Sequence, residues 1–228
     1  LKIGDYLRLE VHNCDLRGDR TYFFTHDLFP LAFLEVENLK AELKYTLLDS
    51  VESIDYTLPP LRIMHLKIEI AKTGKIANLQ DPIAKISLEQ EEKRIIIDSG
   101  DESEKLLQLS KLVKDLDPDI IVTNGGDSYF FSYLLQRAIV SEVSDKFILS
   151  RDEVPFVPKA QQGKTFFSYG RTFYKAPTIR LYGRVHIDVG NTFILNESSF
   201  QGLFEIARIC RTPLHTSSRS SIGSSMSS

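Results

Sequence analysis

The stretch from Leu61 to Ile76 brings a cation and a carboxylate to one surface. Apolar and polar residues alternate along it, which is the two-residue period of a half-buried β-strand. Lys67 and Glu69 are separated by one residue, so they project from the same face of that strand. A lysine and a carboxylate on the same face of a strand are close enough to form an ion pair. The spacing leaves two interpretations, a chemical site or a surface ion pair.

A second candidate is the segment from Pro155 to Ile187, which contains no acidic residue. Cations alternate there with aromatic residues, and such a mixture suits the phosphates and bases of single-stranded nucleic acid. The other interpretation is a β-hairpin with inward aromatic side chains and solvated cations. The residues expected to contact DNA are Lys159, Lys164, Phe166, Phe167, Tyr169, Arg171 and Lys175.

The composition is that of an ordinary globular protein. The chain has 228 residues, 42% hydrophobic content and a net charge of -3, enough for one large domain or a medium domain with a partial one. No stretch approaches the roughly 18 apolar residues that span a bilayer, so no membrane contact is expected. Cys14 and Cys210 lie too far apart to suggest a zinc motif, and a reducing intracellular compartment is expected. Because the chain begins at Leu1, we expect a fragment, and a monomeric one.

The patterning predicts two regions that meet near Tyr56 to Pro60, where two prolines interrupt the pattern. Before this boundary, residues 5–12, 20–26 and 31–36 are predicted as strands and residues 37–49 as a helix. After it come three strands, a helix over 101–117, a buried strand, and a helix that begins at Asp127 or Ser128. A hairpin, a strand ending at Asp188, a helix over 200–209 and a serine-rich tail complete the chain. This order of predicted strands and helices along the chain indicates an α/β fold with a mixed sheet.

Three segments carry a resemblance to a known family. Residues 61–70 (LRIMHLKIEI), 117–138 (DPDIIVTNGGDSYFFSYLLQRA) and 182–189 (YGRVHIDV) resemble, in order and spacing, the 3′ to 5′ exonuclease domain of family B DNA polymerases. The ending RTPLHTSSRSSIGSS is similar to the segment that leads toward the polymerase palm. The resemblance implies a ribonuclease H-like mixed sheet flanked by helices over residues 59–211. It also implies a partial, β-rich N-terminal domain over 1–58 and a truncated connection to the palm over 212–228.

The resemblance implies four carboxylates that hold two divalent metals, and this sequence departs from that set. Lys67 stands where the first strand has its aspartate, and only Glu69 remains of that pair. Phe130 stands at the position of the metal-binding aspartate in the second segment, while Asp127 is expected to cap the helix. The late Tyr-x-x-x-Asp helix is missing, since no tyrosine follows Tyr182. The isolated His65 and His186 are interpreted as strand residues rather than ligands.

The preferred interpretation is a catalytically degenerate exonuclease-like domain that acts as a structural and DNA-binding module and needs no metal cofactor. Its expected partners are single-stranded or primer-template DNA and the remainder of a polymerase chain, in the cytoplasm of a prokaryotic, archaeal-type cell. One alternative is an active exonuclease in which Glu69, Asp127 and Asp188 form a rearranged Mg²⁺ or Mn²⁺ site. Another is a protein-interaction module of the replication machinery. The preferred interpretation predicts that Lys67 lies within reach of Glu69 or in the former metal pocket.

Overall fold

The computed structural model describes residues 18–39, 42–72, 74, 78–156, 164–168, 171–175, 178–192 and 194–219. Contacts divide the chain into two compact units, one of Leu1–Thr57 with Ser198–Ser228 and one of Leu58–Glu197. The domain limits expected from the sequence, at residues 58 and 211, stay predictions. In the part of the chain that is described, no helix is both long and apolar enough to cross a lipid bilayer.

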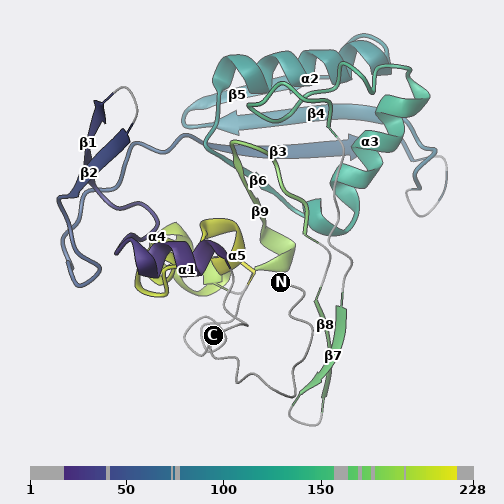
Figure 1. The fold of residues 1–228 in the computed structure, drawn as a ribbon. Helices are drawn as coiled ribbons and strands as arrows, with labels where there is room; N and C mark the ends of the chain where they lie inside the picture. The colour runs from purple at the N-terminus through teal and green to yellow at the C-terminus, as the bar shows by residue number, and fades with distance from the viewer. Residues whose placement is uncertain are drawn as a thin grey trace, which may run out of the picture. The chain divides into compact units, whose positions relative to one another are not determined.

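The larger unit is built on a five-stranded sheet in the order β5-β4-β3-β6-β9 (Figure 1). β3 (Ile63–Ile70), β4 (Ile83–Gln90) and β5 (Lys93–Ile97) are antiparallel neighbours. β6 (Ile120–Thr123) pairs in parallel with β3, and β9 (Val185–Asp188) pairs in parallel with β6. This mixed sheet with its helices confirms the α/β fold class predicted from the sequence.

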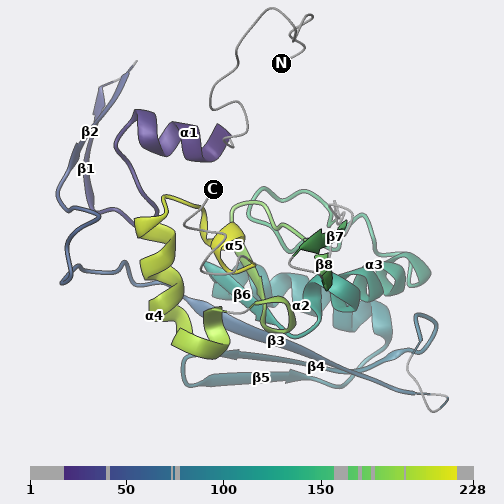
Figure 2. The ribbon, with the colours of Figure 1, turned by 90° about the horizontal axis from the view of Figure 1, so that it is seen from below.

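Two helices cover one face of the sheet (Figures 1 and 2). α2 (Glu102–Leu116) begins with a capping box, in which Asp101 and Glu104 each accept a hydrogen bond from the other's backbone N–H. α3 (Phe131–Val140) follows a single turn of π-helix, η1 (Gly126–Phe130). The buried apolar side chains of both helices join those of β3 and β4 in one core, which includes Met64, Leu66, Ile86, Leu88, Leu106, Leu109, Phe131 and Leu134.

The pleat of β3 separates its side chains into two sets. Met64 and Leu66 point into the core beneath the helices, whereas His65, Lys67 and Glu69 are exposed on the opposite face. The antiparallel register with β4 places Ser87 opposite Lys67 and Lys85 opposite Glu69. The strand predicted from the alternating pattern is therefore confirmed, together with the shared face of Lys67 and Glu69.

The predicted hairpin is also present as backbone structure. β7 (Lys164–Ser168) and β8 (Arg171–Lys175) pair antiparallel, with Lys164 opposite Lys175 and Ser168 opposite Arg171. Of the residues expected to bind DNA, Phe166 and Phe167 lie on β7, while Lys159 and Tyr169 lie outside the described residues. The sequence thus predicted the hairpin, and the role of its side chains stays a prediction.

The smaller unit corrects two of the predicted elements. Residues 20–26, predicted as a strand, belong mostly to the helix α1 (Gly18–Thr25). Residues 37–49, predicted as a helix, instead contain β2 (Glu42–Leu47), which pairs antiparallel with β1 (Leu34–Leu39). α4 (Ile194–Ile209), kinked at Ser199, and α5 (Leu214–Ser217) end the described chain. Aromatic residues favour strands only when a partner strand is available, and α1 has none among the described residues.

A buried arginine fixes the interior of the smaller unit. The guanidinium of Arg208 lies 4.6 Å from the ring centroid of Phe29 and 3.7 Å from that of Tyr56. It pairs with the carboxylate of Asp49 at 3.1 Å and donates hydrogen bonds to the carbonyls of Leu31 and Ser50. These contacts hold α4 against the loop that follows β2 and satisfy a charge that is almost fully buried.

In the larger unit, an aspartate at the end of α2 is paired with three arginines. Asp117 contacts Arg151 at 2.8 Å, Arg62 at 2.7 Å and Arg184 at 2.8 Å, and the Arg184 side chain is only 3% exposed. The hydrogen bond from Arg151, with those from Arg62 and Arg184, lowers the pKa of Asp117 well below its usual range, although burial opposes the shift. The network ties the end of α2 to the starts of β3 and β9.

Asp117→Asn is expected to lower the free energy of unfolding at neutral pH by about 1 to 2 kcal/mol. It removes charged hydrogen bonds from a nearly buried guanidinium, and solvent screening of the partly exposed carboxylate reduces the effect. The folded-state pKa of Asp117 is depressed, so its contribution is complete above the unfolded value of about 4 and declines as the pH falls below it. The difference between wild type and variant should therefore shrink in acid. Urea unfolding followed by circular dichroism across this pH range measures it.

The matched control is Asp115→Asn, which removes an exposed carboxylate from the same helix. The control should leave the free energy of unfolding nearly unchanged at every pH. Equal effects of the two substitutions would contradict the structural role of the arginine network.

Candidate functional site

The two residues of the first strand do not pair with each other. The Glu69 carboxylate contacts the ammonium of Lys85 on β4, with 2.5 Å between Oε1 and Nζ. Within the described part of the chain, Lys67 has no ion-pair partner and is exposed. Glu69 instead forms a cross-strand pair, because the sheet register brings Lys85 directly opposite it. Whether Lys67 occupies the former metal pocket stays a prediction.

Asp188, at the end of β9, is buried and bonded through both carboxylate oxygens. Oδ1 accepts hydrogen bonds from the backbone N–H groups of Gly125 at 2.8 Å and Gly190 at 2.9 Å. Oδ2 accepts a hydrogen bond from the N–H of Asp127 at 2.9 Å. Asp188 therefore fastens the turn between β6 and η1 to the short 3-10 helix η2 (Val189–Asn191).

Asp127 is buried as well, and it does not cap α3 as the sequence predicted. The residue before η1 is Gly125, at φ 78°, and no side chain caps this turn. Instead Asp127 Oδ1 accepts a hydrogen bond from the N–H of Ile179 at 2.8 Å, and Oδ2 accepts one from Asn191 Nδ2 at 2.8 Å. The carboxylate joins three segments that are distant in the sequence, and no local pattern indicates this role.

His186 completes this buried polar cluster, which we define as Thr123, Asp127, His186, Asp188 and Asn191. Its Nδ1 lies 3.1 Å from the carbonyl oxygen of Ile179 and 3.5 Å from Asp127 Oδ1. Because these oxygens only accept, Nδ1 carries a hydrogen. In the neutral ring, Nε2 then accepts from the Thr123 hydroxyl, 2.9 Å away. His186 is a strand residue as predicted, and its ring is occupied by protein partners.

Phe130 belongs to the hydrophobic core. It is 5% exposed, and its ring packs edge-on against Phe131, with 5.3 Å between the centroids. The position at which the resemblance implies a metal-binding aspartate is therefore filled by an apolar side chain with an apolar environment. A carboxylate introduced there would need a new orientation to reach water or a metal ion.

The remaining acids do not lie together. The parallel register of β3, β6 and β9 places His186 and Asp188 on the same sheet face as Met64 and Leu66, whereas Glu69 projects from the other face. Among the described residues, no group of three or more histidine, cysteine or carboxylate side chains is arranged to hold a metal ion. The donor set therefore does not fit the two-metal centre that the resemblance implies.

Gly126 is packed more closely than any sequence pattern indicates. A Cβ at this position would lie 2.1 Å from Thr123 Oγ1 and 2.5 Å from His186 Nε2. The tandem glycines at 125 and 126 suggest a turn, but the close approach depends on the fold. Only glycine allows the polar cluster to assemble beneath η1 without displacement of the imidazole.

Gly126→Ala is therefore expected to destabilise the protein by about 1 to 3 kcal/mol, the usual cost of an added methyl group in a packed interior. Gly74→Ala is the control, because a Cβ there has no neighbour within 4 Å. Thermal unfolding of both variants makes the comparison. A stable Gly126→Ala variant with unchanged His186 proton resonances would show that the cluster is looser than described.

Comparisons with known proteins agree with the resemblance seen in the sequence. No family model matches the chain. A DNA polymerase of Archaeoglobus fulgidus is 29% identical over 143 residues, which cover 60% of this chain and 18% of that protein. A DNA polymerase of Pyrococcus horikoshii is 32% identical over 88 residues, 39% of this chain and 6% of that protein. The chain thus spans less than a fifth of the length of these relatives.

A solved structure shows the same fold. The family B DNA polymerase from the hyperthermophilic archaeon Pyrobaculum calidifontis matches 95% of this chain and 35% of its own, with a TM-score of 0.65 and 18% sequence identity. Together with the archaeal relatives, this match confirms the predicted resemblance to family B DNA polymerases over most of the chain.

Proposed function

We propose that this chain is the exonuclease-like region of a family B DNA polymerase, in which the nuclease centre has degenerated and the domain acts as a structural and DNA-contacting module. The proposed partners are DNA and the rest of the polymerase chain, in the cytoplasm of a prokaryotic cell. We extend the proposal to DNA synthesis by the whole protein only because the similar proteins are DNA polymerases.

One observation supports the proposed loss of nuclease activity. The acids lie on opposite faces of the sheet, and each is already bonded to another group of the protein. Two-metal hydrolysis needs carboxylates that converge on ions roughly 4 Å apart. Here Glu69 is paired with Lys85 on one face of the sheet, while Asp127 and Asp188 accept hydrogen bonds on the other. Moving them together would break these bonds inside the protein, at a cost of about 1 to 3 kcal/mol for each buried group left unsatisfied.

The rearranged metal site formed by Glu69, Asp127 and Asp188 is the alternative that this geometry disfavours, since it needs side chains from both faces. The protein-interaction module is the other alternative. It differs from the DNA-contacting module in the role of the basic, aromatic hairpin formed by β7 and β8. The cationic sequence of this hairpin supports DNA binding, because no acidic residue offsets its charges between Pro155 and Ile187.

The chain is expected to leave a 3′-labelled single-stranded oligonucleotide intact in the presence of Mg²⁺ or Mn²⁺. Lys67→Asp should not restore cleavage, because Phe130 still occupies the position of another ligand. Denaturing gel electrophoresis over a long incubation measures any shortening. Steady metal-dependent shortening that Glu69→Ala abolishes, and that a Glu92→Ala control retains, would overturn the proposed loss of nuclease activity.

DNA binding is expected to weaken as salt increases, since it depends on contacts with phosphates. Combined substitution of Lys164, Arg171 and Lys175 by alanine should reduce the affinity for a single-stranded oligonucleotide. It should also reduce the slope of log affinity against log salt by about 0.7 for each phosphate that the variant no longer neutralises. Fluorescence anisotropy gives both quantities.

The matched control replaces Lys72, Lys93 and Arg94 by alanine, which removes the same charge from exposed positions elsewhere on the larger unit. The control should retain most of the affinity and of the salt slope. Absence of binding, a flat response to salt, or equal weakening by both triple variants would favour the protein-interaction module.

A further inference from the structure

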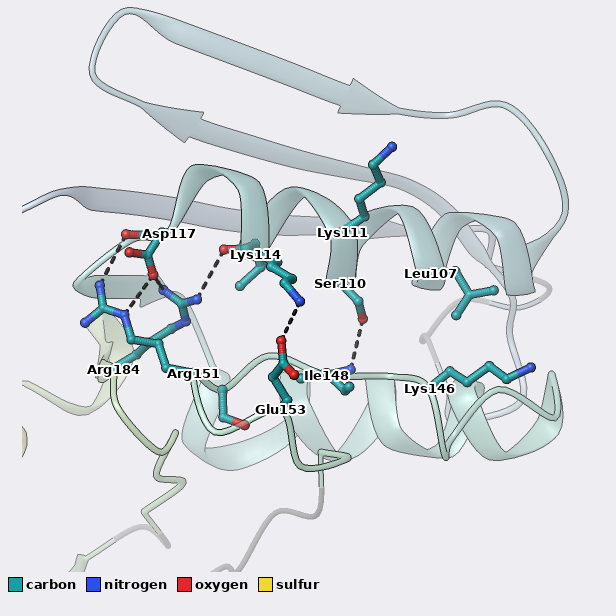
Figure 3. Close-up of a pocket in the computed structure, with 12 residues that line it drawn as sticks. Leu107, Ser110, Lys111, Lys114, Asp117, Lys146, Ile148, Arg151, Glu153 and Arg184 are labelled. Atoms are coloured by element: carbon teal, nitrogen blue, oxygen red, sulfur yellow. Dashed lines mark hydrogen bonds and ion pairs between the residues drawn. The ribbon is translucent and has the colours of Figure 1, made fainter.

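A groove with a volume of about 510 Å³ runs between α2 and the segment of residues 146–153 (Figure 3). Three contacts tie the segment to the helix. Ser110 Oγ accepts a hydrogen bond from the N–H of Ile148 at 3.0 Å, Lys114 pairs with Glu153, and Arg151 donates to Asp117 at 2.8 Å. None of these residues belongs to the buried polar cluster or to the hairpin, so the groove is separate from both.

The charges along this groove are strongly unequal. Five cations line it against two carboxylates. Asp117 is neutralised by its arginines at one end of the groove, and Glu153 is paired with Lys114 near the middle (Figure 3). In the described part of the chain, Lys111 and Lys146 form no ion pair, and both are exposed. Arg151 pairs with Asp119 as well, at 2.6 Å, so the positive charge that the groove offers to a ligand is that of Lys111 and Lys146, together with Lys114 when Glu153 is displaced.

The lining between the cations is apolar rather than aromatic. Leu107, Val113 and Ile148 contribute to it, and no aromatic side chain is among the lining residues. Single-stranded nucleic acid usually gains its sequence-tolerant affinity from bases stacked on aromatic rings, and this groove offers none. An apolar side chain flanked by carboxylates matches both features of the surface.

We propose that this groove binds an acidic segment of a partner protein, with an apolar side chain in the groove and carboxylates on the lysines. Lys114 is the central contact. Its ion pair with Glu153 is solvent-exposed, with 73% and 65% of the two side chains accessible, and such pairs contribute little stability. A carboxylate from the partner therefore replaces that of Glu153, which makes Glu153 an internal competitor for the site.

Neighbouring substitutions in the groove should have opposite effects on binding. Glu153→Gln frees Lys114 and removes a repulsive charge, so the affinity for an acidic ligand should rise by about two- to fivefold, the equivalent of one exposed ion pair. Lys114→Gln combined with Lys146→Gln should lower the affinity by a similar or larger factor. All three side chains are exposed, so the fold is expected to tolerate these changes.

The experiment uses the full chain and a fluorescein-labelled peptide of alternating glutamate and leucine, with fluorescence anisotropy at low ionic strength. A peptide with glutamine in place of glutamate serves as the uncharged probe and should not bind. The control variants are Glu92→Gln, in the turn between β4 and β5, and Lys93→Gln, at the first residue of β5, which change the same kinds of charge outside the groove. They should leave the affinity for the acidic peptide unchanged.

The proposal is overturned if the acidic peptide does not bind, if Glu153→Gln fails to tighten binding, or if Glu92→Gln tightens it equally. A single-stranded oligonucleotide is measured in parallel. If the substitutions at Lys114, Lys146 and Glu153 change its affinity by the same factors and the peptide is unaffected, the groove binds nucleic acid and the protein partner is excluded.

Discussion

Buried carboxylates must have their oxygens hydrogen-bonded, and Asp127 and Asp188 meet this requirement with groups of the protein itself. Asp188 binds the N–H groups of Gly125, Asp127 and Gly190, and Asp127 binds Ile179 and Asn191. These bonds join the ends of the two parallel strands β6 and β9 to the turn that starts the helical layer. The two carboxylates therefore stabilise the fold through hydrogen bonds to the protein itself.

The sheet pleat places Glu69 and the buried polar cluster on opposite faces. Glu69 is the acid that best matches the family, yet it projects from the face opposite the buried polar cluster and pairs with Lys85. Phe130 adds to the core on the helical side. Each substitution is compatible with its surroundings, since Lys67 is solvated and Phe130 is packed. The domain thus keeps the architecture of its relatives without strained or unsatisfied groups at these two positions.

Much of the larger unit follows from sequence patterns. The alternation in residues 63–70, the helical spacing of apolar residues within 101–117 and the apolar run of residues 120–122 each predict their element locally. The wrong predictions lie where the apolar residues fit both the helical spacing and the two-residue spacing of a strand. In residues 37–49, Leu39, Leu43 and Leu47 fit a helical spacing, while Leu43, Tyr45 and Leu47 fit a strand, and pairing with β1 decides the outcome. The ion-pair partner of Glu69 depends on the register between β3 and β4. The hydrogen bond between Asp127 and Ile179 joins residues that are 52 positions apart. Neither feature can be predicted from a local sequence pattern.

The proposed role of this domain depends on the proposed loss of the metal centre. A titration with Mn²⁺ followed by electron paramagnetic resonance tests it directly, because free and bound Mn²⁺ differ in signal and no catalytic turnover is needed. We expect no saturable binding above that of a Glu69→Gln variant. Saturable binding of one or more Mn²⁺ ions by the wild-type chain, absent in Glu69→Gln, would contradict the loss of the centre.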